Sequence, residues 1–192
     1  SDFHGSEYVG DYFKCREYIS GFTGSAGTLV VTLDEAGLWT DGRYFLQAAK
    51  QLEGSGIMLR KERQPGVPAI EEYLKQTLKK GETLGFDGRC IMQDSAEKLI
   101  TQLNAQGVAV RTDIDLTGAV WKNRPELSAQ PVWPLPVEYA GESSESKIKR
   151  VREFLVEKKA DYFLLTSLED IAWLLNMRGN DIRLVINRIR HD

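Results

Sequence analysis

Three polar residues, Thr40, Asp41 and Arg43, lie where an apolar strand is expected to give way to a helix. Strand ends in open α/β sheets are where ligand contacts collect, so these residues are candidates for binding chemistry. A local explanation competes with this one. The Asp41 carboxylate can cap the following helix by accepting a backbone hydrogen bond, and Arg43 can pair with a nearby carboxylate.

The stretch Ser20–Gln47 must position these residues. Three glycines at three-residue spacing indicate a loop that turns tightly or lets another group approach closely. The residues after the loop predict a β-hairpin, with strands over 29–33 and 38–40 joined by a turn at 34–37. A helix is expected from Arg43 to Leu52, and the side chains predicted to face one side of it are Phe45, Leu46, Ala49 and Leu52.

Strands and helices alternate over the next seventy residues. Strands are expected at 57–59, 83–86 and 108–110, with helices over 68–79 and from Asp94 or Ser95 to about 106. A short helix is expected at 116–123. This β-α-β-α-β order predicts an α/β fold with a mixed β-sheet flanked by helices.

Five stretches together carry a resemblance to a known family. They are Ser1–Tyr8, Ser20–Thr28, Trp39–Ala49 (with Trp-Thr-Asp-Gly-Arg-Tyr-Phe-Leu-Gln), Trp121–Pro125 and Leu168–Asp181. The chain resembles the N-terminal, non-catalytic region of aminopeptidase P (X-Pro aminopeptidase), of the creatinase/prolidase superfamily. The last ten residues, 183–192, depart from the family pattern.

The resemblance and the composition predict three parts. Residues 1–124 form a creatinase/prolidase N-terminal-type domain whose start is truncated, and residues 125–143 form a proline-rich linker that disfavours helix. Residues 144–192 begin a second, similar domain that is incomplete. In it we expect a helix over 145–158, a buried strand over 162–165 and a helix over 168–176. The inward residues of the first helix are predicted to be Ile148, Val151, Phe154 and Leu155.

The chain offers little for catalysis by itself. It has two histidines and neither a His-Glu-x-x-His nor a Gly-x-Ser-x-Gly motif. His4 is a lone loop histidine, and Ser25 has no base placed to activate it. We therefore predict no catalytic residue, no metal ligand and no bound cofactor in this chain.

The resemblance implies that the intact protein removes the N-terminal residue from peptides with proline in the second position. It places two manganese ions in a C-terminal domain outside this sequence. It assigns substrate binding to Arg43, whose charged fork can grip a peptide carbonyl or carboxylate, with Asp41 as the supporting residue. A structural ion pair is the alternative role for Arg43. The resemblance further implies a homodimer.

The sequence is also compatible with two other functions. One is a non-enzymatic peptide- or protein-binding module with an aminopeptidase-like fold, and the other is a creatinase or prolidase relative. Metal ligands in the C-terminal domain would distinguish an enzyme from a binding module. The long match around Trp39–Gln47 argues against creatinase and prolidase.

Composition excludes several other classes. The formal net charge of −3 gives no support for a nucleic-acid surface, and no apolar run approaches the length of a membrane span. Cys15 and Cys90 are too few and too isolated for a disulfide framework or a zinc site. We therefore expect a cytoplasmic protein with no nucleic-acid or membrane partner.

Overall fold

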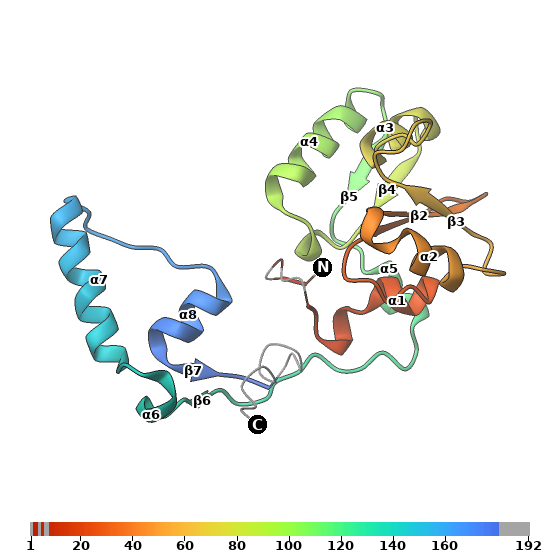
Figure 1. The fold of residues 1–192 in the computed structure, drawn as a ribbon. Helices are drawn as coiled ribbons and strands as arrows, with labels where there is room; N and C mark the ends of the chain where they lie inside the picture. The colour runs from red at the N-terminus through yellow and green to blue at the C-terminus, as the bar shows by residue number, and fades with distance from the viewer. Residues whose placement is uncertain (1, 4, 6–7, 181–192) are drawn as a thin grey trace. The chain divides into compact units, whose positions relative to one another are not determined.

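The computed structural model describes residues 2–3, 5 and 8–180. The chain divides into two compact units, Ser1–Glu126 and Leu127–Asp192 (Figure 1). His4 lies outside the described residues. The stretch 183–192, which departs from the family pattern, also lies outside them.

A three-stranded mixed sheet forms the centre of the first unit. Its strands are β1 (Thr28–Val31), β2 (Ala36–Thr40) and β3 (Ile57–Lys61). β1 and β2 pair antiparallel as the predicted hairpin, with Thr28 opposite Trp39. β2 and β3 pair parallel, with Thr40 opposite Lys61, and the crossover between them contains η2 (Gly42–Tyr44) and α2 (Phe45–Gln51). The predicted mixed sheet is therefore confirmed.

The central strand β2 is buried on both faces. Leu38 and Trp39 are 0% and 1% exposed, and consecutive strand residues point to opposite faces. Leu38 packs with Phe22 and with Ala48 and Leu52 of the α2 segment. Trp39 packs in a second cluster with side chains of α3 (Ile70–Thr77) and α4 (Gln93–Asn104), namely Tyr73, Leu74, Leu99 and Leu103. Helices thus cover both faces of the sheet.

The remaining elements of the first unit follow the predicted order. β4 (Thr83–Gly85) and β5 (Ala109–Arg111) pair parallel in a two-stranded sheet. Between them lie η3 (Gly88–Cys90) and α4. The unit also contains η1 (Asp11–Phe13), α1 (Cys15–Ser20) and α5 (Leu116–Val120).

The inward face of α2 differs from the prediction. Leu52 is buried as predicted, but Leu46 is 90% exposed, Ala49 is also exposed, and Ala48 is buried in their place. A 3-10 turn at 42–44 precedes the α-helix, which begins at Phe45 and not at Arg43 as expected. The buried stripe therefore follows the four-residue spacing of Tyr44, Ala48 and Leu52.

The second unit contains three helices and one small sheet among its described residues. α6 (Val137–Ala140), α7 (Ser144–Lys158) and α8 (Leu168–Leu175) are accompanied by β6 (Trp133–Pro134) and β7 (Met177–Arg178), which pair antiparallel. Ser143 caps α7, its hydroxyl accepting from the Ser146 amide at 3.2 Å. The one-turn helix α6 contradicts the expectation that the proline-rich stretch excludes helix. Pro136 stands at its N-cap, where a proline removes no helical hydrogen bond.

The predicted buried strand at 162–165 is wrong. These residues form neither helix nor strand, and Tyr162 and Leu164 are 92% and 85% exposed. An apolar pattern becomes a strand only with a partner to pair with, and the described sheet of this unit consists of β6 and β7 alone. Phe154, expected to face inward, is 57% exposed among the described residues.

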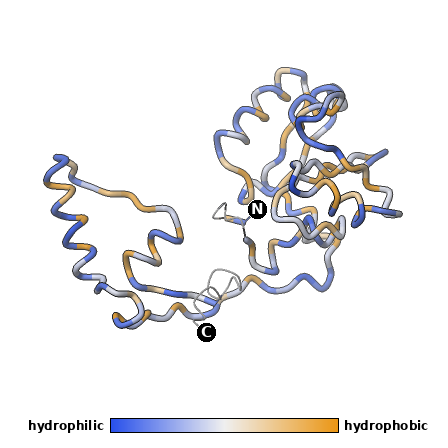
Figure 2. Tube along the Cα trace, viewed as in Figure 1, coloured by the Kyte–Doolittle hydropathy of each residue, from blue (hydrophilic) through white to orange (hydrophobic). Residues whose placement is uncertain are grey.

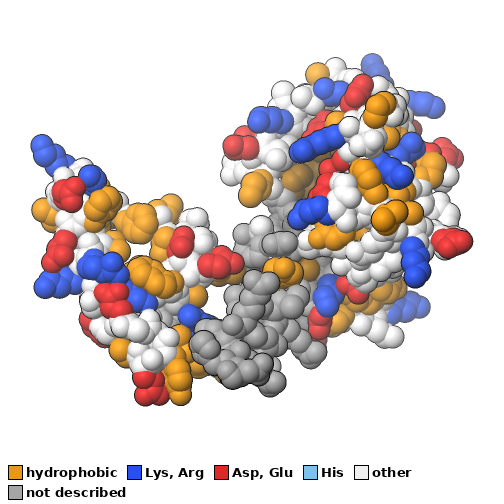
Figure 3. Space-filling model, viewed as in Figure 1, with side chains coloured by type: hydrophobic (Ala, Val, Ile, Leu, Met, Phe, Trp, Pro, Cys, Tyr) orange, Lys and Arg blue, Asp and Glu red, His pale blue; other side chains and the backbone are white. Residues whose placement is uncertain are grey.

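Figure 2 shows hydrophobic and hydrophilic stretches alternating along the second unit, and Figure 3 shows hydrophobic side chains on its surface. Among the described residues, no helix combines the length and the apolar character that crossing a membrane requires.

Candidate functional site

The candidate site begins where β2 ends. Thr40 is fully buried, and its hydroxyl donates to the carbonyl of Ala26 at 2.7 Å, which ties the strand end to the glycine-rich loop. The next residue, Asp41, caps η2: its Oδ1 accepts from the backbone amide of Arg43 at 3.0 Å. The local capping role expected of Asp41 is therefore confirmed, on a 3-10 turn that leads into α2.

Asp41 also holds the guanidinium of Arg43. Arg43 Nε donates to Asp41 Oδ1 at 3.0 Å and Nη2 donates to Oδ2 at 2.9 Å, a two-point contact. These hydrogen bonds, with the Arg43 amide and the charges of Arg43 and Arg63, lower the pKa of Asp41 to about 2. The Arg43 side chain remains 64% exposed. The pair thus presents an oriented, permanently charged group to solvent.

Tyr44 provides a second contact for the same guanidinium. The Arg43 guanidinium carbon lies 5.2 Å from the centre of the Tyr44 ring, within cation–π range. The Tyr44 hydroxyl lies 2.7 Å from the Oγ of Ser25 in the glycine-rich loop. A phenol is a poor base at neutral pH, so this contact does not make Ser25 a nucleophile.

The glycine-rich loop is fixed by an arginine from α1. Arg16 donates to the carbonyl of Gly27 at 2.6 Å and to that of Gly24. Its guanidinium carbon lies 5.4 Å from the ring centre of Phe22, which is fully buried. A Cβ on Gly24 would clash with the Phe22 ring, so the close approach of loop and ring requires glycine there. Arg16 was not singled out from the sequence.

The geometry of Asp41 and Arg43 occurs a second time in the chain. Asp87 Oδ1 accepts from the Arg89 amide at 3.0 Å, and the Arg89 guanidinium contacts the same carboxylate through Nε and Nη2 at 2.9 and 2.8 Å. Both pairs belong to an Asp-Gly-Arg tripeptide just after a strand. The repeated tripeptide is the sequence signal that would have found this second pair. The local geometry is therefore a property of the tripeptide and does not by itself mark a binding site.

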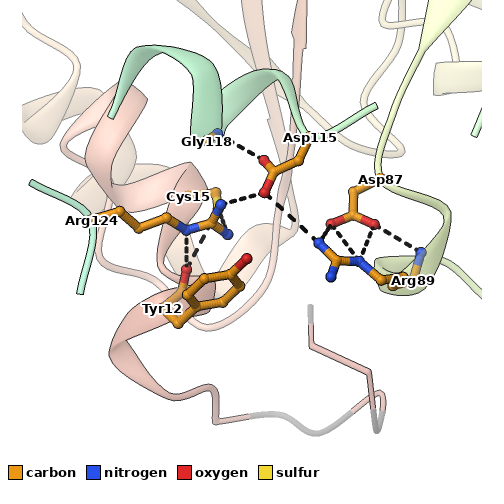
Figure 4. Close-up of polar contacts among 7 residues, drawn as sticks. All are labelled: Tyr12, Cys15, Asp87, Arg89, Asp115, Gly118 and Arg124. Carbon is orange, nitrogen blue, oxygen red and sulfur yellow. Dashed lines mark hydrogen bonds and ion pairs between the residues drawn. The ribbon is translucent and has the colours of Figure 1, made fainter. Parts of the chain in front are cut away.

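Arg89 differs from Arg43 in the structure around it. Its Nη2 lies 3.8 Å from Asp115, which joins it to a network centred on Arg124 (Figure 4). The Arg124 side chain is only 10% exposed and forms an ion pair with Asp115. Its Nε donates to the carbonyl of Tyr12 at 2.8 Å, and its guanidinium carbon lies 3.7 Å from the Tyr12 ring centre. This network ties the last residues of the first unit to its N-terminal helices.

The two free cysteines, Cys15 and Cys90, are half-buried. Arg124 Nη2 contacts the Sγ of Cys15 at 3.2 Å. Burial raises the pKa of the Cys15 and Cys90 thiols, which keeps them protonated and unreactive at neutral pH. Within the described residues, no group of three or more His, Cys, Asp and Glu side chains is arranged to hold a metal ion.

Comparison with known proteins identifies the fold. Two family models, each described as a creatinase/prolidase N-terminal domain, match residues 14–125 and 123–185. The chain belongs to the creatinase/prolidase N-terminal domain family. The family and fold class predicted from the sequence are therefore confirmed.

Several relatives of this chain are aminopeptidases. It is 40% identical over 183 residues to a Xaa-Pro aminopeptidase of Caenorhabditis elegans, a match that covers 95% of this chain and 30% of the relative. It is 40% identical over 182 residues to aminopeptidase P1 of Lotus japonicus, covering 94% of this chain and 27% of the relative.

A solved structure agrees. The crystal structure of the X-prolyl aminopeptidase from C. elegans, described as a cytosolic enzyme with a di-nuclear active site, matches with a TM-score of 0.81. The match is 40% identical and covers 95% of this chain and 30% of that one. The chain thus corresponds to the N-terminal region of Xaa-Pro aminopeptidases and spans about 30% of their length.

Proposed function

We propose that this chain is the N-terminal, non-catalytic region of a metal-dependent X-Pro aminopeptidase. The intact enzyme removes the first residue from peptides with proline in the second position. The observation that carries this proposal is the 40% identity over 95% of the chain to a Xaa-Pro aminopeptidase, with a TM-score of 0.81 to an X-prolyl aminopeptidase structure.

The region contributes a substrate contact through Arg43, with Asp41 as its supporting residue. Asp41 holds the guanidinium through Nε and Nη2, which fixes the direction in which the charged group points. The 64% exposure of the side chain is compatible with this role. Arg89 has the same local geometry but lies against Asp115, which suits a structural role and makes Arg89 the natural comparison.

The reaction itself belongs to other parts of the intact enzyme. The described residues do not offer the ligands of a dinuclear site, so we assign two manganese ions to a C-terminal domain outside this sequence. We further propose a cytoplasmic homodimer. The cytosolic, di-nuclear description of the C. elegans enzyme supports the metal centre and the compartment.

A non-enzymatic peptide-binding module is the alternative function. It uses the same exposed Arg43 to bind a peptide without hydrolysing it. A creatinase or prolidase relative is a further possibility, with different substrates on the same architecture. The high identity to aminopeptidases favours the enzyme over both.

The test of the substrate contact compares Arg43→Ala with Arg89→Ala in the full-length polypeptide that contains this sequence. The substrate is a tripeptide with proline in second position, assayed with manganese. Loss of a charged hydrogen bond, about 1.5–3 kcal/mol, should lower kcat/KM about 10- to 150-fold for Arg43→Ala. Arg89→Ala should leave kcat/KM of the folded enzyme within about two-fold. Equal activity of Arg43→Ala and the parent would refute the contact.

The same assay on the 192-residue chain tests the non-catalytic assignment. We expect no release of the first amino acid with manganese present. Turnover that survives further purification of the chain would overturn the assignment.

A further inference from the structure

We infer that Ser25 and Tyr44 are positioning residues that orient the Arg43 guanidinium for its ligand. This inference rests on the proposed substrate contact of Arg43 and names the residues that make that contact effective. The hydroxyl pair of Ser25 and Tyr44 links the glycine-rich loop to the residue next to Arg43.

The ring of Tyr44 is fixed at several points. Its hydroxyl is held 2.7 Å from Ser25 Oγ, and its ring meets the fully buried Phe22 edge-on, with centres 5.8 Å apart and planes at 86°. One face of the ring lies against the Arg43 guanidinium. Asp41 holds the Arg43 guanidinium through Nε and Nη2. The Tyr44 ring and the Asp41 carboxylate together therefore restrict the orientation of the guanidinium.

The loop that carries Ser25 is itself firmly attached. Arg16 holds two of its carbonyls, as described above. On the other side, the Thr23 hydroxyl accepts from Gln47 Nε2 and from Gln51 Nε2, each at 2.9 Å, which fastens the loop to α2. Ser25 is therefore a fixed reference point for the Tyr44 hydroxyl.

Such an arrangement has a physical benefit for binding. A long arginine side chain loses rotamer freedom when it grips a ligand, and prior restriction of that freedom raises affinity. If the hydroxyl pair acts in this way, its loss should weaken ligand binding through Arg43 and leave the chemical step untouched. The expected change therefore lies mainly in KM.

The experiment is a double-mutant cycle in the full-length polypeptide, with an X-Pro tripeptide as substrate. Tyr44→Phe and Ser25→Ala each remove the same hydrogen bond from opposite sides. We expect each to raise KM about three- to ten-fold with little change in kcat. Combined with Arg43→Ala, each should add less than a two-fold further effect, because the group they position is gone.

Tyr73→Phe is the matched control. Its hydroxyl donates to Glu35, so this variant also removes a tyrosine hydrogen bond from the first unit, at a place remote in the chain from Arg43. It should leave KM unchanged. Thermal unfolding of every variant separates general destabilisation from a change in binding.

The outcomes are distinguishable. If Arg43→Ala raises KM but Tyr44→Phe and Ser25→Ala behave like Tyr73→Phe, the positioning role is refuted and the substrate contact stands. Full additivity with Arg43→Ala also refutes the positioning role. If Arg43→Ala itself has no effect, the substrate contact and the inference both fail.

Discussion

At the scale of single residues, the two Asp-Gly-Arg tripeptides separate local geometry from function. The same capping hydrogen bond and the same two-point ion pair form at Asp41–Arg43 and at Asp87–Arg89. The residues alone predicted the Asp41 cap and a local ion pair for Arg43, because both depend on close neighbours in the chain, and the family resemblance named Asp41 as the supporting residue. The sequence could not predict that Arg89 lies beside Asp115, since that contact depends on how distant segments pack.

The Asp41–Arg43 pair predicts a pH dependence. The pKa of Asp41 is lowered to about 2 from an ordinary 3.8, chiefly by hydrogen bonds from Arg43. Its contribution to stability is therefore complete above about pH 3.8 and is lost as the pH falls through about 2. In Arg43→Gln, the Asp41 pKa should rise part of the way towards 3.8, because the backbone hydrogen bond remains.

Carbon-13 NMR titration of the Asp41 carboxyl measures this pKa directly. Arg89→Gln is the control and should leave Asp41 unchanged while raising the pKa of Asp87, which Arg89 lowers. An Asp41 pKa that is the same in the parent and in Arg43→Gln would contradict the pairing.

The mostly buried guanidinium of Arg124, whose side chain is 10% exposed, predicts a loss of stability on removal. Arg124→Met removes the ion pair to the Asp115 carboxylate and the hydrogen bond to the Tyr12 carbonyl. We expect a loss of about 2–3 kcal/mol in the free energy of unfolding of the first unit. Arg111→Met is the control, since the Arg111–Asp113 pair is exposed at both side chains and should contribute less than about 1 kcal/mol.

Urea denaturation, followed by the amide exchange of β2, measures the free energy of unfolding of the first unit for both variants. Equal effects of the two substitutions would mean that the Arg124 network contributes no more than a surface ion pair.

At the scale of elements, sequence periodicity predicted most helices and strands of the first unit. It failed where the structure depends on which other elements a segment packs against. The positions of the β1–β2 hairpin, the helix α4 and the strand segments β4 and β5 follow from local apolar spacing and turn residues. On α2, Leu52 is buried as predicted but Leu46 and Ala49 are exposed. The strand at 162–165 was wrong because it has no partner strand among the described residues. Which strands pair and which face of a helix is buried depend on the assembled structure.

The glycine-rich loop gives a prediction at this scale. Gly24→Ala would place a Cβ into the ring of the fully buried Phe22, which must shift to accept it. We expect a destabilisation of about 1–3 kcal/mol, the usual cost of overpacking. Gly42→Ala is the control, because its Cβ would meet its nearest neighbour, on Phe45, at 3.9 Å, an ordinary contact.

Chemical denaturation of the two variants measures the difference. A Gly24→Ala protein as stable as Gly42→Ala would mean that the loop adjusts freely, and this would weaken the case that it fixes Ser25.

At the scale of the whole molecule, the chain consists of two units that each match a creatinase/prolidase N-terminal domain model. The proline content of residues 125–143 predicted a linker, and that assignment remains a prediction. Residues 125–132 are all exposed and lie in neither helix nor strand. Because proteases need an extended, accessible backbone, this stretch is the expected site of first cleavage.

Limited digestion with a glutamate-specific protease tests this organisation. Glu126 lies in the exposed stretch, whereas Glu71, Glu72 and Glu97 are held in the helices α3 and α4. We expect the first large product to end at Glu126, and mass spectrometry identifies it. Glu126→Gln should slow its appearance without exposing sites in α3 or α4. Early cleavage in those helices would mean that the first unit opens more readily than its buried clusters around Trp39 and Leu38 imply.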